Sequence, residues 1–149
     1  MQSITQPLHL KLETAVLIRI PVPVAELFDK VSILEIKLAE ITERERRQHV
    51  EKELTILLNE VRVNGLMSFI DTELYGDLKS TNKALWDVCD LRRRFEMAGQ
   101  FDAEFIAQSR HEYQTNDKRA WIKAKINQYF ESDIIEVKSY AHLSHEIPK

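Results

Sequence analysis

The chain contains few of the residues that interrupt helices or cross-link a fold. Its 149 residues include three glycines and four prolines, which argues against a β fold with many turns and favours a helix-rich domain. The single cysteine, Cys89, cannot form an internal disulfide, so an extracellular disulfide scaffold is excluded. We therefore expect a mainly α protein of a reducing compartment, the cytoplasm.

Strong charge of one sign and long apolar runs are also missing. The formal net charge is −3 at pH 7, which creates no field that would make nucleic acid the expected partner. The apolar stretch at residues 15–23 is interrupted by Arg19 and two prolines, and no basic segment followed by an apolar run opens the chain. We predict neither a signal peptide nor a membrane span.

The most regular pattern in the sequence is PVPVAELFDKVSILEIKLAEIT, residues 21–42. A helix that starts near Val24 aligns its apolar side chains at spacings of four and three in one stripe. Glu26, Lys30 and Lys37 project along one edge of this stripe. Either Glu26 and Lys30 form an ordinary i,i+4 ion pair, or all three charges line a cleft beside a neighbouring helix. The stripe itself consists of Leu27, Val31, Leu34, Leu38 and Ile41.

Later apolar rhythms predict three or four further helices. The second helix follows a turn near residues 46–49 and ends at residues 64–65 (Asn-Gly). The third runs to Gly99, and Asp102 caps the fourth. Residues 115–117 (Thr-Asn-Asp) can cap a new helix and would divide the last run in two. The expected fold is a helical bundle of four to five helices.

Two short segments at the ends of the helical region resemble β-strands. Residues 15–22 are rich in β-branched and aliphatic side chains, and residues 134–140 alternate apolar and polar side chains. A lone strand leaves its backbone groups unpaired, so we predict that the two strands pair with each other or between protomers. One helical domain, residues 15–140, then lies between an arm at residues 1–14 and a tail at residues 141–149.

A second charged cluster occupies residues 113–127 (YQTNDKRAWIKAKIN). In a helix, Asn116, Arg119 and Lys123 follow one another at three- or four-residue spacing. Such a face can clamp a carboxylate or a phosphate, because Arg119 offers a bidentate fork and Lys123 a point charge. A solvated basic face is the alternative.

The same region interleaves aromatic with basic residues, a pattern that can stack the bases of a single-stranded nucleic acid. Its aromatic members are Tyr113, Trp121 and Tyr129. Trp121 and Tyr129 also fit the packed face of an amphipathic helix, and we favour this packed interpretation.

Arg92 falls on or near the apolar stripe of the third helix, where its guanidinium group needs an acidic partner. We predict this partner among Glu26, Asp29 and Glu35. An internal ion pair is favoured at this position over a clamp for a substrate.

Motifs for metals and cofactors are missing. His142 and His145 precede Glu146 in the tail, but their order differs from the helical zinc motif and no third ligand is evident. A glycine-rich phosphate loop, a nucleophile elbow and a paired-cysteine site are also lacking. We predict no metal and no cofactor.

Three strings, AELFDKVSILEIKLAEI, YQTNDKRAWIKAKIN and IIEVKSY, resemble the recurring motifs of a family of uncharacterised bacterial proteins, a domain of unknown function. That family is associated with tetratricopeptide-repeat and glycosyltransferase proteins. The resemblance extends from about Ile20 to Tyr140 and implies one intact domain without an established activity. The polar residues that match its motifs are Glu26, Asp29, Lys30, Glu35, Lys37, Tyr113, Asn116, Asp117, Arg119, Lys123, Asn127, Glu136, Lys138 and Tyr140. The first helix is also similar to the helical chorismate mutases, in which arginine and lysine side chains of a helical dimer hold a dicarboxylate.

These patterns predict a small cytoplasmic binding or assembly module, a homodimer with an anion-accepting cleft between the first and fourth helices. The alternative is a small enzyme that acts on a sugar phosphate, a nucleotide or a dicarboxylate, with basic side chains as clamps and Glu26 as general acid or base. A single-strand nucleic-acid binder is the third class. The candidate ligand-binding residues are Lys30, Lys37, Asn116, Arg119 and Lys123.

Overall fold

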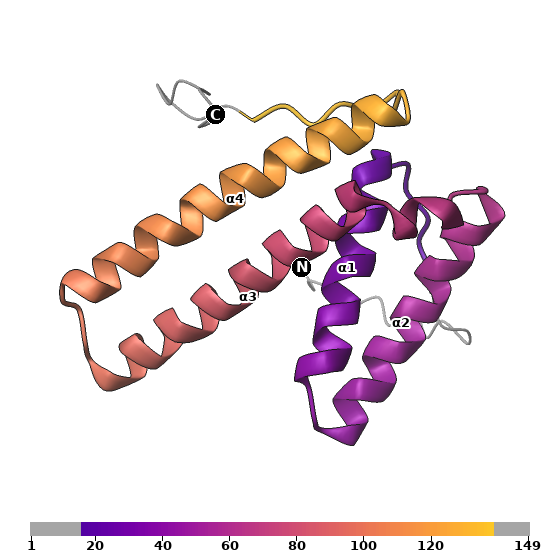
Figure 1. Ribbon diagram of the computed structural model, residues 1–149. Coiled ribbons are helices and arrows are strands. Elements are labelled where there is room, and N and C mark those ends of the chain that lie inside the picture. Colours follow the sequence, from indigo (N-terminus) through magenta and orange to yellow (C-terminus); the bar gives the residue numbers. More distant parts are fainter. Residues whose placement is uncertain (1–15, 139–149) are drawn as a thin grey trace, which may run out of the picture.

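The computed structural model describes residues 16–138, and this part of the chain forms four α-helices and one 3₁₀ helix (Figure 1). The predicted arm at residues 1–14 and the predicted tail at residues 141–149 lie outside the described residues. The mainly α fold with four helices is confirmed. In chain order the elements are α1 (Val24–Glu40), α2 (Arg44–Val63), η1 (Met67–Asp71), α3 (Glu73–Ala98) and α4 (Ala103–Tyr129).

The helices form two hairpins of unequal length. α1 and α2 make the shorter hairpin, and the longer pair of α3 and α4 extends well beyond it on one side (Figure 1). α1 occupies the middle, because it packs against α2, α3 and α4. Its sequence suits this position, since apolar and small side chains occur on more than one face of the helix. The buried residues of α1 are Ala25, Phe28, Asp29, Val31, Ser32, Leu34 and Ile36.

The hydrophobic core is centred on Phe28 of α1, which is fully buried. The centroid of its ring lies 4.5 Å from that of Phe69, 5.8 Å from that of Phe130 and 6.0 Å from that of Tyr75. The core thus contains residues from the first turns of α3 and the last turns of α4. The C-terminal half of α3 and the N-terminal half of α4 extend beyond it (Figure 1). The buried cluster also contains Ala25, Val31, Val61, Leu78, Ile122 and Ile126.

The predicted pair of β-strands is wrong for the residues that the structure describes. Residues 16–23 and 134–138 have no regular secondary structure. The two segments lie in different places, because Arg19 of the first forms a 3.8 Å ion pair with Glu60 of α2, whereas the second runs back beside α4 (Figure 1). Side-chain contacts with helices therefore replace the expected strand pairing.

The turn between α1 and α2 lies at residues 41–43, earlier than predicted. Arg47 explains this position. Its guanidinium group donates hydrogen bonds to the backbone carbonyl of Leu38 and, at 3.0 Å, to that of Ile41. Because the end of a helix leaves such carbonyls without partners, Arg47 stabilises an end of α1 before the predicted turn at residues 46–49.

α4 is continuous through residues 115–117, so the predicted second cap is wrong. Thr115 is buried, and the side chain of Asn116 accepts a 2.7 Å hydrogen bond from Arg119. A cap instead needs a side-chain oxygen that accepts from the backbone N–H groups of a new first turn. The cap predicted at Asp102 is confirmed, because this side chain accepts hydrogen bonds from the backbone N–H groups of Glu104 and Phe105.

Two glycines of α3 and its C-cap allow a matched comparison of Gly→Ala substitutions, one at a left-handed φ and one inside the helix. Gly99 ends α3, as predicted, with a left-handed φ of 64°, so Gly99→Ala should lower the free energy of unfolding by about 1 kcal/mol. Gly76 lies inside α3 with no atom within 4 Å of an added Cβ, so Gly76→Ala should raise it by about 0.5–1 kcal/mol. Urea denaturation measures both changes. A Gly99→Ala variant as stable as the wild type would contradict the predicted strain.

Candidate functional site

The start of α1 is held by side chains that are distant in sequence. Pro23 precedes the helix and provides no side-chain cap. Instead, the backbone N–H of Ala25 donates a 2.8 Å hydrogen bond to Oδ1 of Asn127, and that of Val24 donates a 3.4 Å hydrogen bond to Oγ of Ser132. Both oxygens satisfy N–H groups that a helix start leaves unpaired. These contacts fix the end of α4 and the segment after it against α1.

Lys123 of α4 links this region to three carboxylates. Its side chain is 10% exposed, and its Nζ lies 2.5 Å from Oε1 of Glu26 and 3.4 Å from Oδ2 of Asp29, both on α1. Oε2 of Glu136, in the segment after α4, lies 3.7 Å from the same nitrogen. A buried ammonium group requires such partners, because its removal from water costs several kcal/mol. We refer to Lys123 and these three carboxylates as the Lys123 cluster.

Polar side chains continue from the Lys123 cluster into the interior. Asp29 is buried, and its Oδ1 accepts a 2.7 Å hydrogen bond from the side-chain amide of Asn82 on α3. The same amide nitrogen donates a 2.9 Å hydrogen bond to Oγ of Ser32, which in turn donates a 2.8 Å hydrogen bond to the carbonyl of Asp29. Because buried polar groups are costly unless they are hydrogen-bonded, this network favours a single register of α1 against α3.

The carboxylate of Glu136 lies between two lysines. Oε1 pairs with Lys138 and Oε2 faces Lys123. The hydrogen bond from Lys138 is the main cause that lowers the pKa of Glu136, and the positive charge of Lys123 adds to it, while partial burial opposes both. A carboxylate at this position is therefore stabilised in its ionised form by two ammonium groups at once.

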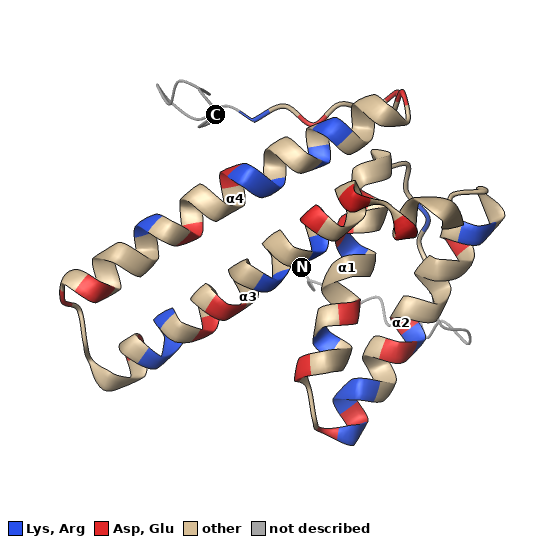
Figure 2. Ribbon diagram, in the orientation of Figure 1, with Lys and Arg blue, Asp and Glu red and all other residues tan. Residues whose placement is uncertain are grey.

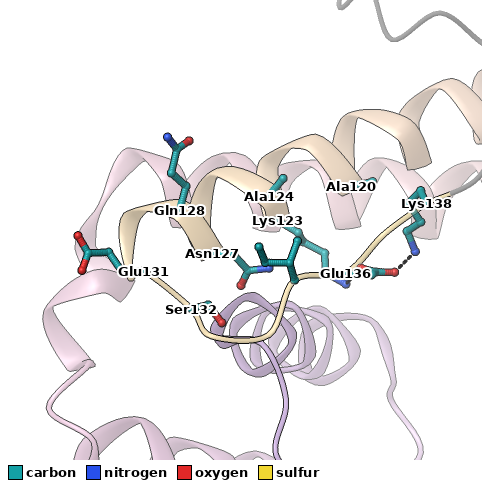
Figure 3. A pocket seen from close by; sticks show the side chains of 10 residues that line it. Ala120, Lys123, Ala124, Asn127, Gln128, Glu131, Ser132, Glu136 and Lys138 are labelled. Atoms are coloured by element: carbon teal, nitrogen blue, oxygen red, sulfur yellow. Dashed lines mark hydrogen bonds and ion pairs between the residues drawn. The ribbon is translucent and has the colours of Figure 1, made fainter.

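A hollow of about 380 Å³ opens beside Glu136, between α4 and the C-terminal segment. Figure 3 shows Lys123, Asn127 and Glu136 close together, with the side chains of Gln128 and Glu131 directed away from them. Seven of the ten residues that line the hollow are polar or charged, and such groups can orient a small bound molecule. Its lining residues are Ala120, Lys123, Ala124, Asn127, Gln128, Glu131, Ser132, Ile135, Glu136 and Lys138.

The candidate lysines of α1 lie apart from this hollow. Lys30 pairs with Glu53 of α2, and Glu26 contacts Lys123, so the ordinary i,i+4 pair between Glu26 and Lys30 is not formed. Lys37 lies nearer the C-terminal end of α1, and neither α1 lysine lines the hollow. The charged residues along this edge of α1 therefore pair with two different helices, Lys30 with α2 and Glu26 with α4.

Of the three candidates on α4, only Lys123 lines the hollow. Arg119 donates its 2.7 Å hydrogen bond to Asn116 within the helix. The region between α1 and α4 is occupied by Lys123 and its α1 partners, and the adjacent hollow lies between α4 and the C-terminal segment.

Arg92 pairs with Glu112 of α4, and the prediction of a partner on α1 is wrong. All three acids proposed there have other partners. Two of them contact Lys123, and the third, Glu35, lies 2.8 Å from the Nζ of Lys79 on α3.

The prediction that Trp121 and Tyr129 belong to the packed face is wrong for Trp121, whereas the ring of Tyr129 packs at the edge of the core, with its centroid 5.7 Å from that of Phe69. Trp121 is 37% exposed and Tyr129 is 67% exposed. The buried Ile122 and Ile126 form the inward face of this part of α4, and Trp121 is turned away from it. Tyr129, seven residues after Ile122, lies on the same line at the end of the helix, where its ring is partly covered by Phe69. Lys125 covers the indole, with its Nζ 3.4 Å from the ring centroid.

Several residues of the site were not predicted as such from the sequence: Ser32, Asn82, Ser132, Glu136 and Lys138. One signal was available on α1, where Asp29 and Ser32 are polar residues three apart among apolar neighbours. That spacing places both side chains on one side of a helix and indicates a buried polar network. No local pattern indicates that the segment after α4 folds back, and the alternation around Glu136 predicts a strand instead.

Titration of the Glu136 carboxyl group by NMR should give a midpoint below the ordinary glutamate value of about 4.3. Because folding lowers this pKa, the stability that Glu136 contributes is present above its unfolded pKa and is lost as the pH falls through the folded one. Lys138→Gln should raise the midpoint, whereas Lys118→Gln, an exposed substitution on α4, should not. A wild-type midpoint at the ordinary value would show that the lysines do not hold this carboxylate.

Residues 16–138 contain neither a metal cluster nor a membrane-spanning helix. No group of three histidine, cysteine, aspartate or glutamate side chains in this range can hold a metal ion. The residues His142, His145 and Glu146 lie outside it. No helix of the described chain has the length and apolar character needed to cross a membrane.

Comparison with known proteins connects the chain to a family and not to an activity. Residues 18–148 match the model of a family described as being of unknown function, and no curated protein or solved structure matches the chain. The resemblance to an uncharacterised family is therefore confirmed. These comparisons show no association with tetratricopeptide-repeat proteins, glycosyltransferases or chorismate mutases.

Proposed function

The chain belongs to the family of unknown function DUF6165, and from its geometry we propose that it is a binding module for a small ligand that carries a carboxylate group. The proposed site is the hollow beside the Lys123 cluster. The observation that carries the proposal is Glu136, whose carboxylate lies between Lys123 and Lys138 at the edge of this hollow. A ligand carboxylate in place of Glu136 would meet the same two ammonium groups.

The position of Glu136 on an exposed segment makes such an exchange feasible. Its side chain is 35% exposed, and the neighbouring Ile135 and Val137 are 75% and 83% exposed. Because the Glu136 side chain is partly exposed, its carboxylate can turn to solvent while the backbone of the segment, with Lys138, stays beside α4. The start of α1, which Asn127 and Ser132 cap, adds partial positive charge near the hollow.

The surrounding charges favour a carboxylate over a phosphate. The three carboxylates of the Lys123 cluster face two ammonium groups, those of Lys123 and Lys138, so the group carries one excess negative charge. A ligand carboxylate that replaces Glu136 keeps this balance, whereas a phosphate dianion adds negative charge in a partly buried place. Among the anions predicted from the sequence, we therefore favour carboxylates over sugar phosphates and nucleotides.

The geometry gives less support to an enzyme. Glu26, the predicted general acid or base, contacts Lys123 at 2.5 Å and does not line the hollow. A general acid or base must come within hydrogen-bonding reach of the group whose proton it moves. We accordingly propose binding without turnover, and the cytoplasm stays the predicted location.

Thermal unfolding in the presence of succinate, acetate, inorganic phosphate and a sugar phosphate tests the proposal. A carboxylate at 100 times its dissociation constant adds about 2.7 kcal/mol of stability, which corresponds to a rise of about 5–10 °C in Tm. Glu136→Gln removes the internal competitor and should tighten carboxylate binding. Lys138→Gln should weaken it, and the matched variant Lys118→Gln should not change it.

Three results would overturn the proposal. The first is that no carboxylate raises the Tm of the wild type or of Glu136→Gln. The second is that Lys118→Gln weakens binding as much as Lys138→Gln, because this would indicate attraction by general positive charge. The third is that phosphate raises the Tm more than the carboxylates do.

A further inference from the structure

Three of the residues that line the hollow beside the Lys123 cluster are apolar. Ala120 and Ala124 belong to α4, close to Lys123 (Figure 3), and Ile135 belongs to the segment after the helix. The two alanines are four residues apart and therefore lie one above the other on one side of α4. The hollow thus presents apolar surface next to the lysine that faces Glu136.

Ile135 is exposed although its side chain is large and aliphatic. It is 75% exposed, and Ala124 on the opposite side of the hollow is exposed as well. Removal of apolar surface from water is favourable. A bound molecule whose own apolar part covers Ile135 and the alanines therefore gains affinity from the hydrophobic effect.

The charged residues of the hollow provide for a single carboxylate. The last turns of α4 and the segment after it carry both signs of charge (Figure 2), and the lining residues include two cations, Lys123 and Lys138, and two acids, Glu131 and Glu136. A carboxylate in place of that of Glu136 engages both lysines. A second anionic group would meet no third cation among the described residues that line the hollow, and Glu131 would repel it.

We infer that the hollow selects monocarboxylates with a short aliphatic chain. This inference rests on the proposed function, because the ligand carboxylate must first take the place of Glu136. The carboxylate then lies against the two lysines, and the chain packs on Ala120, Ala124 and Ile135. The volume of about 380 Å³ falls within the range of about 300–1,000 Å³ that small-molecule sites have, so it admits more than a carboxylate group.

NMR titrations of the full chain carrying Glu136→Gln, with acetate, butyrate and succinate as the ligands, test the inference. Each methylene group that the apolar residues cover lowers the dissociation constant about two- to fourfold. Butyrate has two methylene groups more than acetate, so it should bind about 4- to 16-fold more tightly. Succinate has as many carbons as butyrate but ends in a second carboxylate, and it should bind at least about fourfold more weakly than butyrate, although it still occupies the site at saturation.

Two serine substitutions in the same background locate the apolar contact. Ile135→Ser should lower the ratio of the acetate and butyrate dissociation constants at least about twofold. The matched control is Val137→Ser, because Val137 lies in the same segment, is 83% exposed and does not line the hollow. It should keep the ratio of the background, and circular dichroism should show unchanged helicity in both variants because both residues lie outside the helices.

Each possible failure has its own meaning. Equal dissociation constants for acetate and butyrate would overturn the inference but not the proposed carboxylate site, because both ligands carry that group. Succinate that binds as tightly as butyrate would also overturn it, as would an equal loss of the ratio in Ile135→Ser and Val137→Ser. If none of the three carboxylates shifts any resonance, the proposed function fails and this inference fails with it.

Discussion

Lys123→Met should lower the free energy of unfolding by about 3–5 kcal/mol, the typical loss when one partner of a buried ion pair is removed. Methionine keeps most of the apolar stem of lysine but leaves Asp29, a buried residue, and Glu26 without their cation. Without the lysine, the negative charges of Asp29 and Glu26 repel each other. Their partly buried position strengthens this repulsion, because water screens it less there. Urea denaturation followed by circular dichroism measures the loss.

A double-mutant cycle identifies the cause of this loss. Asp29→Asn in the Lys123→Met background removes the uncompensated charge and should recover more than about 1 kcal/mol relative to additive effects. Lys118→Met, a substitution of an exposed lysine on the same helix, should change stability by less than about 0.5 kcal/mol. An additive cycle would show that Lys123 stabilises the fold through its stem and not through its charge.

Phe28→Ala should lower the free energy of unfolding by about 3–5 kcal/mol. The Phe28 ring is fully buried and contacts the rings of Phe69, Tyr75 and Phe130, which belong to η1, α3 and the end of α4. Its removal leaves a cavity where three elements meet, so collapse of any one neighbour cannot fill it.

Denaturation by urea again gives the size of this effect, with Val63→Ala as the control at a 62% exposed site. The control should change stability by less than about 0.5 kcal/mol. If Phe28→Ala cost no more than the control, the position of the core would be wrong. Equal losses of unfolding free energy in Phe28→Ala and Val63→Ala would show that the hydrophobic core is not centred on α1.

Local signals in the sequence predicted the helices well and their long-range contacts poorly. The four-three rhythm of apolar residues, Gly99 and Asp102 predicted the course of α3 and the start of α4, because periodicity and capping are local properties. The turn after α1 was misplaced because Arg47 reaches back to the last carbonyls of that helix. The strands were wrong because residues 134–138 contact α4 through side chains, and alternation alone does not reveal such a partner.

The candidate site was predicted in part. The sequence predicts Lys123 and Glu26 at a cleft between the first and fourth helices, whereas in the structure the two side chains contact each other at 2.5 Å. The sequence did not reveal that Glu136 supplies a carboxylate to the same lysine, since that contact depends on how the chain turns after α4. The neutralisation of Lys30 by Glu53 was missed for the same reason, because it depends on the crossing of α1 and α2.

The proposed function requires that Glu136 occupies a carboxylate site that a ligand can take over. A crystal structure of the Glu136→Gln variant grown with saturating succinate tests this directly. We predict a succinate carboxylate in the hollow, within about 3 Å of the Nζ of Lys123 or Lys138, which is the distance of a charge-assisted hydrogen bond. A hollow without succinate, with Lys123 bound only to Glu26 and Asp29, would contradict the account.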